Sequence, residues 1–193
     1  MDNFSEKVSF IWSVADLLRG DYKQSEYGKV ILPLVVLRRL DCVLAPTKEA
    51  VLAEHGKHQG RVENVDPILE RITGHKGLFN TSKFDLPKLL DDPNHVADNL
   101  RAYIAGFSAV PREVMHRFGF DVHIDRLDRS KLLYLVVSKF CDIDLHPDRV
   151  SNVEMGYVYE ELIRRFSEQS NETAGEHFTP REVIKLMVNL LFL

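Results

Sequence analysis

The chain has 193 residues, of which 45% are apolar and 28% charged, and its net charge is -4. This length allows one sizeable core, or one domain plus the start of a second. The composition is that of an ordinary soluble globular protein, and the net charge excludes a chain that coats nucleic acid with its whole surface, although it is compatible with a local contact patch.

Two features of the sequence bear on where the protein resides. The amino terminus, "MDNFSEKVSF", carries acids and no basic segment, so it is not a signal peptide, and no apolar run reaches the roughly 20 residues that span a bilayer. Cys42 and Cys141 stand in apolar helical settings without a metal-ligand spacing, which predicts free thiols in a reducing compartment. We therefore expect a cytoplasmic protein that does not contact a membrane.

Helical periodicity dominates the beginning of the chain. Apolar residues recur at spacings of three and four from Phe4 to Leu18, which predicts a helix that stops at Gly20. Residues 27–44, "YGKVILPLVVLRRLDCVL", predict a second helix that is apolar almost all round and therefore central. Because proline lacks the backbone N–H, we expect a kink or a late helix start at Pro33.

Capping signals divide the middle of the chain into further helices. The expected cap positions, with the helices that they open, are Thr47 (to about Gly56), Asp66-Pro67, Asp92-Pro93 (through Val96, Leu100, Ile104 and Phe107) and Asp128 (through Leu132, Leu135, Val136 and Phe140). A short helix is also expected after Pro111. No segment shows convincing strand alternation, so the predicted fold class is all-α, a multi-helix bundle.

The predicted helix with the clearest boundaries begins at "SNVE", where Ser151 and Glu154 form a capping box. Its apolar stripe consists of Met155, Tyr159, Leu162, Ile163 and Phe166. The polar residues 167–175 follow without apolar anchors, which predicts a mobile loop.

A second capping box opens the last predicted helix. Thr179 is expected to cap it, Pro180 takes the first helical position, and Glu182 reaches back from the third. The helix presents an apolar face and runs into "LLFL" without a C-terminal cap. We therefore expect a truncated chain whose continuation would cover that face.

Three segments, taken together and in order, resemble one protein family. They are "VILPLVVLRRLD", "MGYVYEELIRRF" and "GEHFTPREVIKLM". They are similar to the modification (M) subunit of type I restriction-modification systems, which are N6-adenine DNA methyltransferases that use S-adenosylmethionine. The resemblance implies a helical amino-terminal domain at residues 1–166, a flexible linker at 167–175, and the truncated start of an α/β S-adenosylmethionine-dependent methyltransferase domain at 176–193.

The resemblance also implies a cofactor site. In the family, a G-[EQ]-[FYH]-[FY]-T-P-R segment bridges the helical and catalytic domains and lies against the cofactor. The positions that match it, and are the candidate cofactor-binding residues, are Glu176, His177, Phe178, Thr179, Pro180 and Arg181. A capped helix N-terminus offers free N–H groups and a positive dipole end to the methionine carboxylate. Phe178 would cover an apolar face of the ligand and Glu176 would pair with its amino group, whereas His177 stands where the family often has an aromatic ring. The alternative interpretation is a plain helix start.

The family's remaining signatures are missing from the chain. Resemblance predicts a glycine-rich cofactor loop and an Asn-Pro-Pro-aromatic motif that grips the target adenine, but none of the 10 glycines has G-x-G spacing and no Pro-Pro occurs. Adenine must be flipped out of the duplex and held before methyl transfer. We therefore expect no catalytic residue in this chain and no activity from it alone.

Pairs of adjacent arginines are the other candidates for nucleic-acid contact. Arg38-Arg39 and Arg164-Arg165 are candidates for phosphate binding. Because neighbours on a helix point in different directions, we expect each pair to combine one partly covered stem with one solvated charge. Residues 112–131 mix basic and acidic side chains in nearly equal number, which predicts a solvated surface rather than a basic patch.

Histidines and aromatic residues have simple structural interpretations. His55, His58 and His75 lie in a loop region without a carboxylate or thiol in a recognised pattern, so no metal site is predicted. Trp12 and Tyr159 lie on apolar stripes and are expected in the core rather than as base-stacking platforms.

The resemblance implies that the complete subunit methylates adenine N6 in DNA, with a specificity subunit, a second M subunit and a restriction subunit as partners. This chain would be the scaffold that closes over DNA and contacts the other subunits. Two alternatives stay open: a non-enzymatic helical interaction module, whose gene would stop at residue 193, and the amino-terminal domain of a single-chain restriction-methylation enzyme, whose gene would continue into a nuclease domain.

Overall fold

The computed structural model describes residues 2–58, 60–170, 179 and 181–191. Every regular element in these ranges is a helix, and the bridges Arg19–Tyr22 and Asn80–Phe107 are isolated, which confirms the all-α prediction. The α-helices are α1 (Asp2–Leu18), α2 (Tyr27–Leu44), α3 (Lys48–His58), α4 (Asp66–Thr73), α5 (Val96–Ala105), α6 (Ala109–Arg117), α7 (Phe120–Arg129), α8 (Leu133–Cys141), α9 (Asn152–Ser170) and α10 (Arg181–Leu191). Short 3-10 turns lie at Gln24–Glu26, Ala45–Thr47 and Pro87–Asp91. None of the helices in the described ranges is long and apolar enough to cross a membrane.

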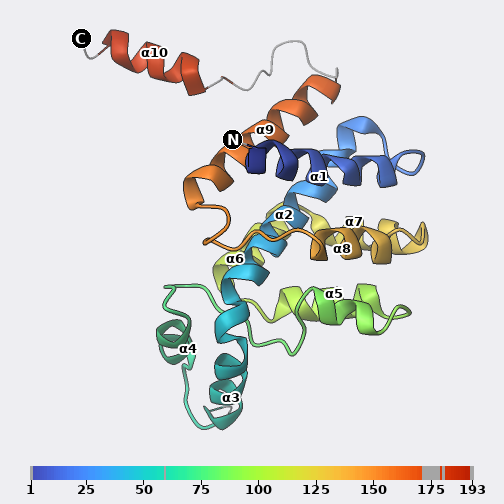
Figure 1. Cartoon of the computed structure of the whole chain (residues 1–193). Coiled ribbons are helices and arrows are strands. Elements are labelled where there is room, and N and C mark those ends of the chain that lie inside the picture. The colour runs from blue at the N-terminus through green and yellow to red at the C-terminus, as the bar shows by residue number, and fades with distance from the viewer. Residues whose placement is uncertain (1, 59, 171–178, 180, 192–193) are drawn as a thin grey trace.

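Helix α2 is the central element of the fold. It spans the predicted residues 27–44 and is buried along most of its length, as its apolar composition indicated. It packs against α1, α7, α8 and α9, and Figure 1 shows α1, α8 and α5 stacked one below another along it. Pro33 lies inside the helix and is buried, so the late start that we considered there does not occur.

Helices α1 to α9 form the helical body of the protein. Helices α1 and α9 pack together at one end of it (Figure 1). The predicted capping box of α9 is confirmed, since Glu154 N donates to Ser151 Oγ (3.2 Å) and Ser151 N donates to a Glu154 carboxylate oxygen (2.8 Å). The Trp12 ring stacks on Phe166 with a centroid distance of 5.1 Å. Tyr159 donates its hydroxyl to the Leu32 carbonyl (2.7 Å). Both aromatic residues therefore serve the core, as predicted.

Several predicted helix boundaries in the middle of the chain are wrong. The helix expected from Asp92-Pro93 begins only at Val96, because Asp92 closes a turn by accepting from the backbone N–H of Asn94 (3.3 Å). Phe107 lies beyond this helix, in the bridge with Asn80. Asp128 lies inside α7 and does not cap α8. Helix α7 was missed because its charged sequence obscures the buried stripe of Phe120, His123, Ile124 and Leu127.

Two expected N-caps are also absent. Thr47 donates its hydroxyl to the Leu44 carbonyl (3.2 Å) instead of accepting from α3. The chain passes from α2 through the 3-10 turn into α3 without a break, so α3 begins without an N-cap and ends at His58. Asp66 is the first residue of α4, which places Pro67 one position later than predicted.

Helix α9 continues through Ser170, four residues into the predicted linker. Residues 171–175 lie outside the described ranges.

The buried side chain of His123 predicts that the stability of the protein depends on pH. Its side chain is buried, and its Nδ1 has no hydrogen-bond partner among the described residues. Burial lowers the pKa of His123 below its usual value of 6.5, with Lys29 and Arg126 lowering it further and Glu26 opposing them. The folded protein therefore holds this ring neutral, whereas the unfolded chain accepts the proton first as the pH falls.

We expect the free energy of unfolding to fall between pH 7.5 and pH 5.5, and to fall less in His123→Phe than in the wild type. Because the folded pKa is depressed, the stability is fully present above the unfolded pKa and is lost as protons bind the unfolded chain. Phenylalanine keeps a ring against Tyr22, whose centroid lies 5.9 Å from that of His123. Urea unfolding at the two pH values measures the difference; equal pH dependence in both proteins would contradict the assignment.

Candidate functional site

The predicted cofactor segment is only partly within the described residues. Glu176, His177, Phe178 and Pro180 lie outside them. Thr179 is exposed, and α10 begins at Arg181, one position after the first helical residue predicted, Pro180. The first turn of a helix carries N–H groups without intrahelical partners. A helix start therefore lies close to the predicted one, and the contact of these residues with a cofactor stays a prediction.

Helix α10 presents an uncovered apolar face. The exposed apolar side chains are Val183 (43%), Ile184 (46%), Leu186 (58%), Met187 (53%), Val188 (45%), Leu190 (67%) and Leu191 (75%). Figure 1 shows this helix apart from the other helices. Such a face is stable in water only when another surface packs on it. An apolar face of this kind is typical of a surface that packs against another protein surface.

Arg38 binds the last residue of α8 and the chain that follows it, instead of facing solvent. It lies on α2, and its side chain is 13% exposed. Its Nε donates to the Ile143 carbonyl (2.7 Å) and one Nη to the Cys141 carbonyl (3.1 Å). Its other Nη donates to the carboxylate of Asp41 (3.0 Å). All three edges of the guanidinium are therefore used inside the molecule.

Arg39 binds the same chain segment further along. One Nη donates to the carbonyls of Leu145 and Val150, the latter at 2.7 Å, and the other donates to Asn152 Oδ1 (2.7 Å). Partial burial lowers the pKa of Arg39. The prediction of one covered and one solvated arginine is thus wrong at this pair. Sequence spacing gave no signal for the contacts with backbone carbonyls, because those carbonyls lie more than a hundred positions away.

The second arginine pair behaves differently. Arg164 pairs with Glu161 (2.7 Å) and with Glu168 on the same helix, and its side chain is 43% exposed. Arg165 also pairs with Glu161 (2.8 Å) and lies over the Trp12 ring at 5.6 Å. This pair therefore forms carboxylate contacts along α9.

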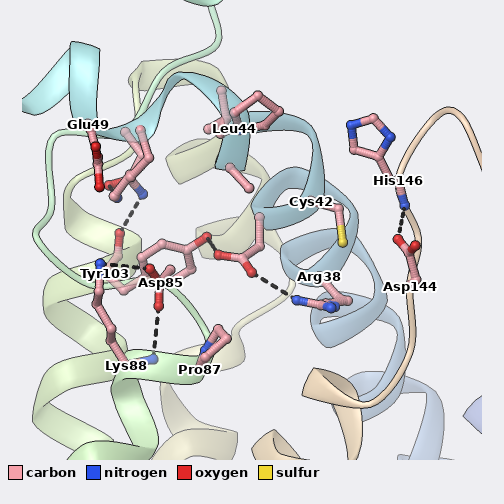
Figure 2. Close-up of a pocket in the computed structure, with 15 residues that line it drawn as sticks. Arg38, Cys42, Leu44, Glu49, Asp85, Pro87, Lys88, Tyr103, Asp144 and His146 are labelled. Atoms are coloured by element: carbon pink, nitrogen blue, oxygen red, sulfur yellow. Dashed lines mark hydrogen bonds and ion pairs between the residues drawn. The ribbon is translucent and has the colours of Figure 1, made fainter.

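A buried polar cluster lies beside Arg38 and is shown in Figure 2. Asp41 accepts from the Tyr103 hydroxyl (2.9 Å), the backbone N–H of Leu86 (3.2 Å) and Arg38 (3.0 Å). Figure 2 labels Tyr103 and Arg38, the two side chains that donate to this carboxylate. Burial raises the pKa of Asp41, while the hydrogen bonds from Tyr103 and Leu86 and the Arg38 charge oppose that shift. The cluster joins α2, α5 and the turn at Pro87–Asp91.

Lys48 closes the cluster on the side of α3. Its side chain is buried, donates to Asn80 Oδ1 (3.4 Å) and lies over the Tyr103 ring at 5.6 Å. Desolvation lowers the pKa of Lys48 from 10.5 to about 8. The cavity around these residues measures about 530 Å³ and also contains the Lys88–Asp85 ion pair (3.0 Å). Its cations therefore face carboxylates, a ring or an amide of the chain itself, which indicates a structural polar core rather than a preformed anion site.

The histidines of the described residues do not gather into a metal site. His58 contacts Glu54 on its own helix, with 2.8 Å between Nε2 and the carboxylate. In the described part of the chain, no group of three His, Cys, Asp or Glu residues is placed to hold a metal ion. Cys42 and Cys141 are both free.

Two protein families match successive parts of the chain. Residues 7–140 match the family described as the HsdM N-terminal domain, and residues 151–192 match the N-6 DNA Methylase family. A similar protein is the type I restriction enzyme MjaIX methylase subunit of Methanocaldococcus jannaschii, 26% identical over 197 residues. That alignment covers 94% of this chain and 34% of the relative, so the chain spans about a third of the relative's length.

The two family matches divide the structure between α8 and α9. The first ends within α8, and the second begins at the capping residue of α9 and includes α10. The division of the chain at residues 166 and 176 stays a prediction. The first match covers most of the chain, and the helical structure agrees with it. The chain therefore belongs to the HsdM N-terminal domain family, the helical amino-terminal part of type I restriction-modification methylase subunits, and continues into an N-6 DNA methylase segment.

Proposed function

We propose that the complete protein transfers a methyl group from S-adenosylmethionine to adenine N6 in DNA. The observation that supports this most strongly is the succession of two family matches, HsdM N-terminal domain and N-6 DNA Methylase, in one chain. The second match also weighs against a self-contained interaction module. The glycine-rich loop and the Asn-Pro-Pro-aromatic motif would lie in the part of the protein that follows residue 193. The chain alone is expected to be inactive.

The helical body would close over DNA and pack against other subunits. The partners that we propose are DNA, a specificity subunit that reads the sequence, a second methylase subunit and a restriction subunit. Arg101 on α5 is bound by Asp121 (2.7 Å) and Asp125 on α7, so its charge is already paired within the chain. Free thiols at Cys42 and Cys141 agree with a cytoplasmic location.

We further propose that Glu176, His177, Phe178, Thr179, Pro180 and Arg181 contact the cofactor. S-adenosylmethionine supplies the electrophilic methyl group when it is bound. The α10 N-terminus would attract the carboxylate of S-adenosylmethionine. Phe178 would exclude water from one apolar face of this cofactor. The exposed position of Thr179 and the start of α10 at Arg181 support this arrangement.

The experiment is cofactor binding and methyl transfer by the complete subunit together with its specificity subunit. We expect Phe178→Ala to weaken S-adenosylmethionine binding about tenfold, or about 1.4 kcal/mol, with an unchanged melting temperature. Tyr134→Ala, at a 39% exposed aromatic residue on α8, is the control and should bind as the wild type does. Unchanged affinity in Phe178→Ala would contradict the cofactor assignment, and methylation at a base atom other than adenine N6 would contradict the proposed reaction.

A further inference from the structure

We propose that Arg38 and Arg39 are positioning residues for methyl transfer. Together with their acceptors in residues 141–152 they form an arginine clasp that fixes the connection between the helical body and the methylase segment. The positioning role rests on the proposed function, whereas the clasp rests only on contacts between described residues.

The first argument is the position of the acceptors. The carbonyls that the clasp binds belong to Cys141, Ile143, Leu145 and Val150, and the last acceptor is the Asn152 side chain. These residues span the interval between the two family matches, because the first match ends at residue 140 and the second begins at residue 151. Two neighbouring residues of the central helix thus bind both ends of the connection, and Lys7 of α1 donates to the Asp144 carbonyl between them (2.9 Å).

The second argument is the need for donors in this segment. Residues 142–151 form turns and extended chain without a helix, and among the described residues the carbonyls of Ile143, Leu145 and Val150 accept no backbone N–H. Ile143, Leu145 and Val150 are nevertheless buried. Buried carbonyl groups require a hydrogen bond. Arginine supplies five donors in a planar fork, whereas lysine supplies three from a single point. One guanidinium can therefore bind carbonyls that are several residues apart.

The third argument is what the connection carries. Helix α9 starts at Asn152, itself a clasp acceptor, and lies on α1 and α2 through buried Val158 and Leu162. Helix α9 is also the first element of the methylase match. Polar contacts therefore fix the first residue of α9, and apolar contacts hold the rest of the helix against α1 and α2. Without the clasp, α9 would still pack along its length, but the position of its N-terminal end relative to α2 would vary.

The first test is amide hydrogen exchange on the 193-residue chain. We expect Arg39→Lys to accelerate exchange about tenfold in residues 142–152, with unchanged exchange in α2 and α5, because local opening is controlled by local contacts. Arg117→Lys is the matched control: this arginine is 76% exposed and contacts Glu113 (2.6 Å) one turn away. Unchanged exchange in residues 142–152 of Arg39→Lys would overturn the clasp and the positioning role together.

The second test is kinetics of the complete subunit with its specificity subunit. We expect kcat for DNA methylation to fall about tenfold in Arg39→Ala, with an intermediate value in Arg39→Lys. The number of S-adenosylmethionine molecules bound per subunit should stay unchanged; a merely structural defect would lower it in proportion to kcat. An unchanged kcat in both variants, or a fall matched by lost binding sites, would overturn the positioning role. No methylation by the wild type would overturn the proposed function and the positioning role with it, while accelerated exchange would still establish the clasp.

Discussion

Replacement of Asp41 by alanine is expected to lower the free energy of unfolding by about 3–5 kcal/mol, the largest effect that we predict for a single residue. The Asp41 side chain is 8% exposed and accepts from Arg38, Tyr103 and Leu86. Alanine leaves a buried hydroxyl and a buried backbone N–H without an acceptor and removes the countercharge of a nearly buried guanidinium. Unsatisfied buried groups lose their full hydration, which makes removal of one partner costly.

Asp41→Asn and Tyr103→Phe separate the contributions to this effect. Asparagine keeps an acceptor oxygen and a similar volume, so Asp41→Asn should lower the free energy of unfolding less than Asp41→Ala does. Tyr103→Phe removes only one hydrogen bond and should cost about 1–2 kcal/mol. Glu113→Ala is the surface control, since its pair with Arg117 is exposed and should contribute less than about 1 kcal/mol. Urea unfolding at pH 7 measures all four; a loss for Asp41→Ala no larger than that of Glu113→Ala would show that the cluster does not stabilise the fold.

Replacement of Gly106 by alanine is expected to lower the free energy of unfolding by about 3 kcal/mol. Gly106 follows α5 with φ of -72°, a conformation that every residue adopts, so backbone strain is not the reason. A Cβ atom there would lie 2.6 Å from the backbone nitrogen of Ser82 and 2.7 Å from Asn80 Oδ1. Backbone hydrogen bonds hold this approach, with Thr81 N donating to the Gly106 carbonyl (2.8 Å). The added methyl group would have to separate the two segments.

Gly56→Ala provides the matched control for Gly106→Ala. Gly56 is in α3, and a Cβ atom there would meet no atom within 4 Å. Alanine forms helix more readily than glycine, so this variant should gain roughly 0.5–1 kcal/mol. Thermal unfolding of the two variants should therefore move in opposite directions. A Gly106→Ala variant as stable as the wild type would mean that the Ser82 segment moves freely away from α5.

The arginine clasp changes how the "LRRL" segment is understood. Its resemblance to a family indicated that the segment matters, but the residues themselves allowed phosphate contact or solvent exposure. The structure directs both arginines to carbonyls of one connecting segment. This difference has a general cause. The sequence reveals where an arginine lies on its helix, whereas the acceptors of its side chain depend on which distant backbone the fold brings next to it.

The sequence by itself determined the all-α class, the central helix at residues 27–44, the capping box at Ser151 and Glu154, and the helix start after Thr179. These features are local: periodicity and caps act within about four residues, so they can be read without knowledge of the fold. Only the tertiary structure decided that Asp128 lies inside a helix, that Gly106 touches Ser82, and that Arg38 and Arg39 hold residues 141–152. Those features depend on contacts between segments far apart in the chain, where packing overrides local preference because burial and hydrogen bonding outweigh differences in propensity of less than about 1 kcal/mol per residue.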